Sequence, residues 1–520
     1  MYVPSDFPRF VSRFLLFCVI VAGSLLWARC VLMTANGQAS GPPQSKLSPF
    51  LQRKLEAGGA TARLPVIVEV RGRQAWNRLP RSRSARMIGR SSSLSARLSL
   101  EELRLWDRHP EVVRISYDAP LRTFSSASRL APPSPASLSE PFLQSLGAAG
   151  LASQGRDGAG VGVAVFDSGI ADLPDLEGKV VHRVDFSDGA GQQSGWRRAG
   201  FDPYGHGTHV AGILAASGLS ADVRGIAPGI HLIDVRVIDA AGRGRASGLI
   251  AAIEWVIDNR RRFNIRVANL SLGHLPLQSP HTDPLARAAA RMAAAGIVTV
   301  ASAGNFGRTP RGDRLWGLIA SPAHHPDLIT VSPLNTRGSA HIDDDLATTY
   351  GSRGPALWDG GLKPDLTAPG NRIPSLAAPG SSLQRQRWRS GQDPRTLELS
   401  GASMAVPYVA GAAALLLQAA PEMQPSMLKR ILTLSSRRLA RPHLLEQGSG
   451  LPHLPSALRL AESLNGLPVS ALLLTPSQTP AASGAIWTDG AIWTDGAIWT
   501  DGAIWTDGAI WTDSTTEDPE

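Results

Sequence analysis

Apolar residues follow two different spacings along residues 140–465. Short runs that are apolar at most positions lie at 161–167, 231–239, 267–273, 297–304 and 328–334. Apolar residues recur at helical spacing in the intervening and following segments, at 209–217, 249–262, 283–296 and 404–420. Apolar strands separated by helices are typical of a parallel sheet that is covered on both faces. We therefore expect an α/β fold here: a doubly wound, mostly parallel sheet with helices on both faces, in one domain.

A smaller unit precedes this domain. Its strand candidates are 65–70 and 111–117, and residues 99–109 have apolar positions at helical spacing. Seven arginines fall within 71–90, which is expected to form a loop. These patterns predict a small α+β domain. Ser, Pro and Ala dominate 125–139, which predicts a linker to the larger domain.

The N-terminus has the pattern of a secretory leader. Fifteen largely apolar residues, 14–28, follow two arginines, and this length suits a signal sequence better than a full membrane span. Ala35 and Ala39 are candidate cleavage neighbours, which gives a leader of residues 1–39. The alternative is an uncleaved membrane anchor through 14–33, because apolar residues resume after Arg29.

The chain has only two cysteines, Cys18 and Cys30, and both lie in this leader. A cleaved chain would therefore have no thiol nucleophile, disulfide or cysteine-bound zinc. The formal net charge of +9 is unevenly distributed, since 47–123 carries +8 and 466–520 carries −8. No nucleic-acid-binding motif accompanies the basic part, so we expect no nucleic-acid partner.

The C-terminus is repetitive. GAIWTD occurs five times in tandem at 484–513, after a Pro-, Ser- and Ala-rich linker at 466–483 and before an acidic tail at 514–520. Because six is an even number, Trp and Asp share one face of an extended strand in every repeat, whereas a helix would scatter the tryptophans. Three interpretations stay open: a strand that binds an unidentified protein or surface, a self-associating segment, and an expanded low-complexity repeat without a role.

Three separated motifs supply an acid, an imidazole and a hydroxyl. DSG ends the first apolar run, YGHGTHVAG at 204–212 opens a helical segment, and SGASMAVP at 400–407 opens the longest helical segment. In a doubly wound sheet, the carboxyl ends of the strands and the N-termini of the helices meet at one crevice. We therefore expect Asp167, His206 and Ser403 to converge there.

This set of side chains suits nucleophilic catalysis. A serine hydroxyl such as that of Ser403 is a weak nucleophile and needs a base to take its proton. The imidazole of a histidine has an intrinsic pKa near neutrality, so His206 can serve as that base. Asp167 would accept the other ring N–H and stabilise the imidazolium. A helix N-terminus at Ser403 also favours developing negative charge.

In this order, the motifs resemble those of the subtilases, the subtilisin-like family of serine endopeptidases. The resemblance covers about 320 residues and rests on VAVFDSGI, GHGTHVAG, NLSLG, ASAGN, KPDLTAPG and SGASMAVP. It implies hydrolysis of protein or peptide substrates through an acyl-enzyme. It also implies that Asp167, His206 and Ser403 are catalytic, and that Asn305 and Ser403 form the oxyanion hole.

The resemblance extends to substrate and metal binding. Residues 269–273 match the strand that pairs with substrate main chain, and the substrate-binding residues implied are Leu270, Ser271, Leu272, Gly273 and Gly304. No cofactor is required. Many members bind calcium where this chain has 217–222, but calcium prefers six to eight oxygens. Only Asp175 and Asp222 offer carboxylates there, so they are uncertain calcium ligands.

The smaller unit resembles the inhibitory propeptide of secreted subtilases. This implies a propeptide at 40–124, with its terminal strand within 109–118 and self-cleavage near Phe124. The chain would then be a zymogen whose own propeptide is a partner. Its location would be secreted or extracytoplasmic, with membrane anchoring as the alternative.

Other functions fit the sequence less well. An α/β-hydrolase esterase requires G-x-S-x-G, but Ala405 occupies the second glycine position. A dinucleotide site requires its glycines after a strand, whereas GAGVG at 158–162 precedes one. The remaining rival is an inactive subtilase scaffold that binds a partner through its tryptophan tail. Retention of all four catalytic positions disfavours this rival.

Overall fold

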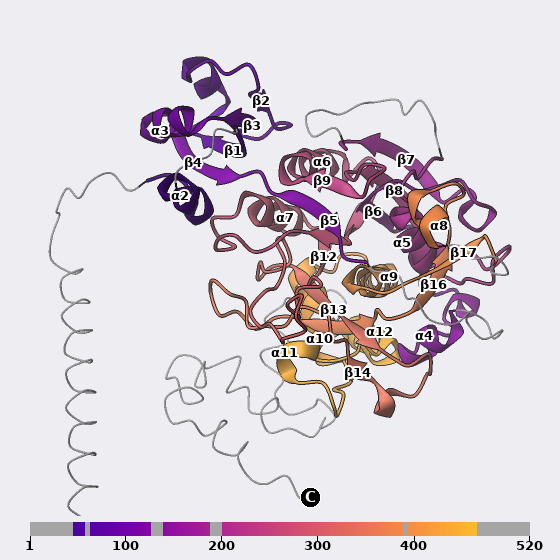
Figure 1. The fold of residues 1–520 in the computed structure, drawn as a ribbon. Helices are drawn as coiled ribbons and strands as arrows, with labels where there is room; N and C mark the ends of the chain where they lie inside the picture. Colours follow the sequence, from indigo (N-terminus) through magenta and orange to yellow (C-terminus); the bar gives the residue numbers. More distant parts are fainter. Residues whose placement is uncertain (1–44, 58–62, 126–138, 188–199, 388–392, 465–520) are drawn as a thin grey trace, which may run out of the picture. The chain divides into compact units, whose positions relative to one another are not determined.

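Figure 1 shows the computed structural model of the chain, which describes residues 45–57, 63–125, 139–187, 200–387 and 393–464. The expected leader, most of the first linker, the second linker, the GAIWTD repeats and the acidic tail lie outside the described residues.

An eight-stranded sheet forms the centre of the larger domain. The strand order is β14-β13-β12-β10-β6-β8-β7, with β15 also paired to β13. Every pair is parallel except β13–β14. The strands are β6 Gly162–Asp167, β7 Val180–Asp185, β8 His231–Arg236, β10 Ile265–Leu270, β12 Val298–Ser302, β13 Ile329–Asn335, β14 Leu346–Ala347 and β15 Leu366–Pro369. β6 and β12 are buried at every position, as their apolar sequences predict.

Helices cover both faces of this sheet, which confirms the expected doubly wound α/β fold. One face contributes to a core with α5, α9, α10 and α12, and the other to a second core with α6 and α7. The α-helices are α4 Glu140–Ser145, α5 His206–Ala215, α6 Ala246–Asn259, α7 Pro284–Ala294, α8 Ser382–Arg387, α9 Ala402–Ala419, α10 Pro425–Leu434, α11 Leu444–Gln447 and α12 Leu454–Ser463. Short 3-10 turns are η2 Ala152–Gln154, η3 Pro174–Leu176 and η4 Ile342–Asp344.

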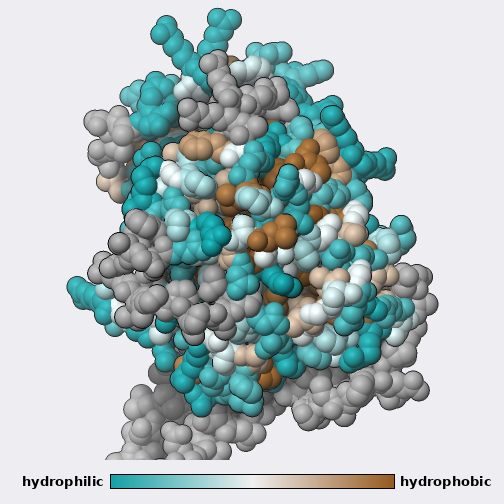
Figure 2. Space-filling model, turned by 90° about the vertical axis from the view of Figure 1, so that its right-hand side faces the viewer, coloured by the Kyte–Doolittle hydropathy of each residue, from teal (hydrophilic) through white to brown (hydrophobic). Residues whose placement is uncertain are grey.

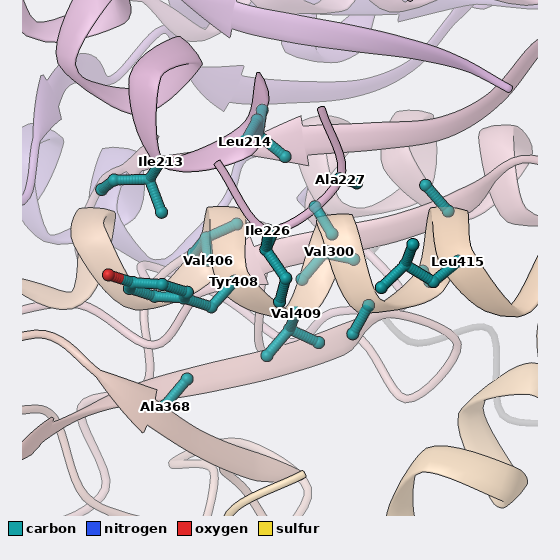
Figure 3. Close-up of a cluster of buried hydrophobic side chains, with 14 of the residues drawn as sticks. Ile213, Leu214, Ile226, Ala227, Val300, Ala368, Val406, Tyr408, Val409 and Leu415 are labelled. Atoms are coloured by element: carbon teal, nitrogen blue, oxygen red, sulfur yellow. The ribbon is translucent and has the colours of Figure 1, made fainter. Parts of the chain in front are cut away.

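The central helix is α9. By length and composition it could cross a membrane, but 89% of it is buried inside the protein, as in the core helix of a globular domain. Figure 3 shows Ile213 and Leu214 of α5 on one side of α9 and Ala368 of β15 on the other. This packing holds the first turn of α9 beside the sheet.

The N-terminal α+β unit has its own core beneath an antiparallel sheet of order β2-β3-β1-β4. Its elements are α2 Pro49–Glu56, β1 Leu64–Val70, η1 Arg73–Arg78, β2 Arg86–Met87, β3 Ser93–Leu98, α3 Leu100–Arg108 and β4 Val112–Tyr117. The expected strands appear as β1 and β4 and the expected helix as α3, which starts with a Ser99–Glu102 capping box. The arginine-rich stretch is not entirely loop, because η1 and β2 lie within it.

Two smaller sheets complete the fold. In the first, β5 Pro120–Thr123 lies between β11 Leu272–Gly273 and β9 Arg243–Arg245. In the second, β16 Ile373–Leu376 pairs with β17 Thr396–Leu399. Figure 1 shows β5 running from the N-terminal unit into the larger domain.

The view in Figure 2 shows one side of the molecule. Hydrophilic residues cover most of the coloured surface there, and hydrophobic residues are confined mainly to the middle of the face. This distribution is ordinary for a globular protein, so hydropathy on this face does not by itself mark a site.

Candidate active site

Asp167 and His206 form a buried hydrogen-bonded pair. Asp167 is the last residue of β6 and His206 is the first residue of α5. Both therefore lie where the sequence predicted them, at a carboxyl end of a strand and at an N-terminus of a helix. His206 Nδ1 lies 2.8 Å from Asp167 Oδ1 and 2.9 Å from Oδ2. Because an ionised carboxylate only accepts, Nδ1 is the donor and Nε2 is left as the basic nitrogen.

Local backbone geometry brings this pair together. Gly205 precedes His206 with φ of 99°, a left-handed conformation that turns the chain into α5 and that other residues rarely adopt. Ser168 N donates to Asp167 Oδ1 at 2.8 Å, which orients the carboxylate. The pair is nearly inaccessible to solvent, with His206 0% and Asp167 1% exposed.

Ser403 lies in the first turn of α9, but its hydroxyl is not bonded to His206. Ser403 Oγ donates to Ser271 O at 2.6 Å and accepts from Phe124 N at 2.8 Å. His206 Nε2 has no hydrogen-bond partner among the described residues. The expected imidazole–hydroxyl contact is therefore not made, because the hydroxyl is held by the Ser271 carbonyl and the Phe124 amide.

A peptide of the chain itself occupies the cleft beside Ser403. Strand β5 is antiparallel to both neighbours, with Thr123 opposite Leu272 on β11 and Leu121 opposite Gly244 on β9. The chain then continues to Phe124, whose carbonyl oxygen accepts a hydrogen bond of 3.3 Å from Ser403 N.

Two groups surround that carbonyl. Gly401 leaves room for it, since a Cβ there would collide with Phe124 O and crowd Ser125 Cα. Asn305 Oδ1 accepts from Ala402 N at 3.1 Å, which orients the side-chain amide and leaves Nδ2 as its donor. The peptide bond after Phe124 thus lies at the N-terminus of α9.

The Phe124 side chain fills an apolar pocket. It packs with Ala320 and Ala402, and its ring meets Phe306 edge-on with centroids 5.3 Å apart. Ala402 is fully buried at this contact, in the first turn of α9. Leu121, three residues earlier, is also fully buried.

Only some of the expected substrate-binding residues lie against β5 and Phe124. Leu272 and Gly273 pair with β5, and Ser271 O accepts from Ser403. Leu270 is a buried core residue of β10 rather than a direct partner of β5. Gly304 lies at the pocket, where a Cβ would stand 3.1 Å from that of Ala320.

Comparison with known proteins identifies the family. A family model described as the subtilase family matches residues 158–450, which is more than half of the chain. The chain belongs to the subtilase family. The match contains all of β6, α5 and the first turn of α9.

Several relatives support this result. Serine protease AprX of Bacillus subtilis (strain 168) is 38% identical over 282 residues, 53% of this chain and 61% of AprX, so the aligned part spans less than two thirds of that relative. The alkaline protease of Alkalihalobacillus alcalophilus is 31% identical over 368 residues, 70% of this chain and 79% of that protein.

A solved structure shows the same fold. Fervidolysin from Fervidobacterium pennivorans, described as a keratinolytic enzyme related to subtilisin, superposes with a TM-score of 0.61 at 20% identity. The match covers 82% of this chain and 65% of fervidolysin. The architecture is therefore subtilisin-like.

The expected calcium ligands of this subtilase do not fit calcium. Asp175 is fully buried, and its Oδ1 accepts from Leu219 N at 2.7 Å and Ser220 N at 3.2 Å, while the Ser220 hydroxyl bonds Oδ2. Asp222 is exposed on the same loop. No group of three or more metal-binding side chains occurs among the described residues. Backbone and hydroxyl donors thus occupy the carboxylate that calcium would need.

Some residues of the site were not predicted from the sequence. Asp202, Phe306 and Leu121 have no motif of their own, and only the three-dimensional contacts reveal them. His209 is buried beside the site and its Nε2 lies 2.9 Å from Leu397 O and 3.1 Å from Ile373 O. Burial lowers the pKa of His209 to about 3, so this ring stays neutral and serves to join α5 to β16 and β17.

Proposed function

We propose that this subtilase is a serine endopeptidase that hydrolyses peptide bonds of protein substrates through an acyl-enzyme intermediate. The observation that carries the proposal is the position of the Phe124–Ser125 peptide, whose carbonyl oxygen is bonded to Ser403 N. Pairing of β5 with β9 and β11 further supports it, because such pairing recognises main chain rather than a particular sequence.

The proposed reaction begins with rotation of the Ser403 hydroxyl from Ser271 O toward His206 Nε2, which has no other partner among the described residues. His206 takes the hydroxyl proton while Oγ attacks the substrate carbonyl carbon. Asp167 stabilises the resulting imidazolium and does not itself become protonated.

Negative charge then develops on the carbonyl oxygen. Ser403 N donates to that oxygen, and Asn305 Nδ2 supplies the second donor. His206 returns its proton to the leaving amine, which gives the acyl-enzyme. Water activated by His206 hydrolyses the ester and restores Ser403.

The N-terminal unit acts as a self-processed inhibitory propeptide in this proposal, with cleavage between Phe124 and Ser125. Its contacts support the assignment of 40–124. Asp118, 3% exposed, accepts from Ser247 N at 2.9 Å and Ser247 Oγ at 2.8 Å at the start of α6. Glu69 forms an ion pair of 2.5 Å with Arg287 of α7.

The remaining assignments complete the proposal. The catalytic domain is 140–465, and the leader at 1–39 directs the chain to secretion, with anchoring through 14–33 as the alternative. Proteins or peptides are the substrates, and the propeptide is an intramolecular partner. For the repeats at 484–513, the three interpretations stay open: binding of an unidentified surface or protein, self-association, and a low-complexity repeat without a role.

Expression of the full chain tests this function. The wild-type chain should yield a fragment beginning at Ser125 and hydrolyse casein, while Ser403→Ala should stay intact and lose hydrolysis by about 10⁴-fold or more. Ser153→Ala changes an exposed serine that is distant in sequence from Ser403, and this variant should behave as wild type. Unchanged hydrolysis in Ser403→Ala would overturn the mechanism. If the wild-type chain is inactive, the rival function, an inactive subtilase scaffold that binds a partner, would be favoured.

A further inference from the structure

Asp202 is a buried carboxylate outside the catalytic set. It is 1% exposed and lies four residues before His206. Its Oδ1 accepts from Ser168 Oγ at 2.8 Å and from Gly205 N at 2.7 Å. Its Oδ2 accepts from Thr208 N at 2.9 Å and from Thr208 Oγ1 at 2.7 Å. Four donors therefore surround this carboxylate, although burial is the larger effect and raises the pKa of Asp202.

These donors come from both halves of the Asp167–His206 pair. Ser168 follows Asp167 directly at the end of β6, whereas Gly205 and Thr208 flank the start of α5. Ser168 Oγ also accepts from Gly207 N at 3.0 Å, so the same hydroxyl bonds to the helix and to Asp202. The carboxylate thus joins the strand end to the first turn of the helix.

Neither reacting group contacts Asp202 by a hydrogen bond. The carboxylate of Asp167 bonds to His206 Nδ1 and Ser168 N, and His206 Nε2 is unpartnered among the described residues. A role of Asp202 in the reaction must therefore act through the placement of these two side chains.

We propose that Asp202 is a positioning residue, which holds the end of β6 against the start of α5 and thereby fixes the Asp167–His206 pair. This inference rests on the proposed function. A residue that only capped α5 would need bonds to helix amides alone, whereas Asp202 also receives the Ser168 hydroxyl from the sheet side.

Asp202→Asn is the most informative change, because it preserves shape. Either orientation of the new amide points its NH₂ group at a backbone donor, Thr208 N–H or Gly205 N–H, and makes the neighbouring hydroxyl of Thr208 or Ser168 accept instead of donate. The strand–helix junction should then open locally. A misplacement of about 1 Å can cost about 100-fold in rate, so kcat should fall about 10- to 100-fold. KM should change little, since β9, β11 and the Phe124 pocket are untouched.

The assay is cleavage of a peptide substrate by the self-processed enzyme, with kcat expressed per active site titrated by a serine-directed covalent probe. Asp172→Asn is the matched control. Its carboxylate is 68% exposed and is bonded to Arg183 rather than to the junction. Thr208→Val is a second variant, which removes one donor to Asp202 and the acceptor of Ala171 N at 3.0 Å, and retains the backbone bond to Asp202.

The pH profile separates positioning from simple loss of stability. His206 faces Asp167, Tyr204 and His209, and none of these is altered in the variant. A looser Asp167 contact disfavours the imidazolium. The acid limb of kcat should therefore move to lower pH in Asp202→Asn and stay in place in Asp172→Asn.

A nuclear magnetic resonance measurement of the Asp167–His206 hydrogen bond completes the test. The proton between His206 Nδ1 and Asp167 should give a downfield proton resonance in the Ser403→Ala chain, and Asp202→Asn should shift or broaden it. Wild-type kcat per titrated site, with an unmoved acid limb and an unchanged resonance, would overturn the proposal even if the melting temperature fell. If Asp202→Asn does not fold, an unaltered kcat and pH limb in Thr208→Val would overturn it. An inactive wild-type chain would instead refute the proposed function.

Discussion

The segment of the chain that lies beside Ser403, from β5 to Phe124, predicts which side chains of a substrate the enzyme recognises. Residues 119–127, APLRTFSSA, form a test substrate whose cleaved bond follows Phe124. Three single changes probe it: Phe124→Ala, Leu121→Ala and Arg122→Ala. The first two side chains are 5% and 0% exposed, whereas Arg122 is exposed. Only the buried positions should matter for kcat/KM.

The expected losses follow from the apolar area that each side chain buries. A phenylalanine buries about 150–250 Å², which at about 25 cal/mol per Å² is about 4–6 kcal/mol, of which alanine and incomplete exposure in the free peptide retain a part. A net loss of about 3 kcal/mol lowers kcat/KM by about 150-fold. Leu121→Ala loses about 2 kcal/mol, or about 30-fold. Arg122→Ala should stay within about twofold, because an exposed side chain buries little.

The measurement is competitive hydrolysis of the four peptides by the self-processed enzyme, followed by mass spectrometry. Competition compares kcat/KM directly and cancels errors in enzyme concentration. Equal cleavage of the Phe124→Ala peptide, or a penalty for Arg122→Ala as large as that for Leu121→Ala, would show that β5 does not mimic a substrate.

Three further predictions concern stability and the propeptide, with the inactive Ser403→Ala chain used for the two stability measurements. Because donors from its loop already satisfy Asp175, excess EDTA should shift the melting temperature by less than about 2 °C, and a larger fall would indicate a structural cation there. In the folded chain the pKa of His209 is lowered to about 3. As pH falls below about 6.5, the His209 ring therefore binds a proton in the unfolded chain but not in the folded chain. The free energy of unfolding in urea should then decrease as pH falls, by up to about 1.4 kcal/mol per pH unit from this group. The His209→Gln variant should have a flatter slope, and equal slopes would contradict the assignment. Asp118→Ala removes two bonds to Ser247, so less of the cleaved N-terminal fragment should co-elute with the enzyme in gel filtration, and undiminished co-elution would contradict this role.

Much of the larger domain could be predicted because its signals are local. The sequence of β6 is apolar throughout and ends in Asp167, and the segment after Gly205 has helical spacing, so both strand and helix were expected. Parallel topology then places strand ends and helix starts at one edge. That reasoning placed Asp167 and His206 together without knowledge of their contact distance.

The contacts of Ser403 could not be predicted in the same way. Its hydroxyl accepts from Phe124, which lies 279 residues earlier in the chain, and donates to Ser271. A motif identifies the residue but does not determine its rotamer, which depends on whatever lies in the cleft. For the same reason, no motif identifies Phe306, whose contact is with Phe124 of the peptide beside Ser403.

These two results divide the site into a rigid half and a movable half. The Asp167–His206 half is held by the buried bonds of Asp202 and Ser168, all of which come from the enzyme domain itself. The Ser403 hydroxyl is instead held by one bond to the occupying peptide and one to Ser271. Rotation to His206 exchanges the bond to Ser271 for another hydrogen bond, so its net cost is small compared with that of moving a buried strand or helix. We therefore expect the triad to be completed by rotation of this side chain, with the positions of β6 and α5 unchanged.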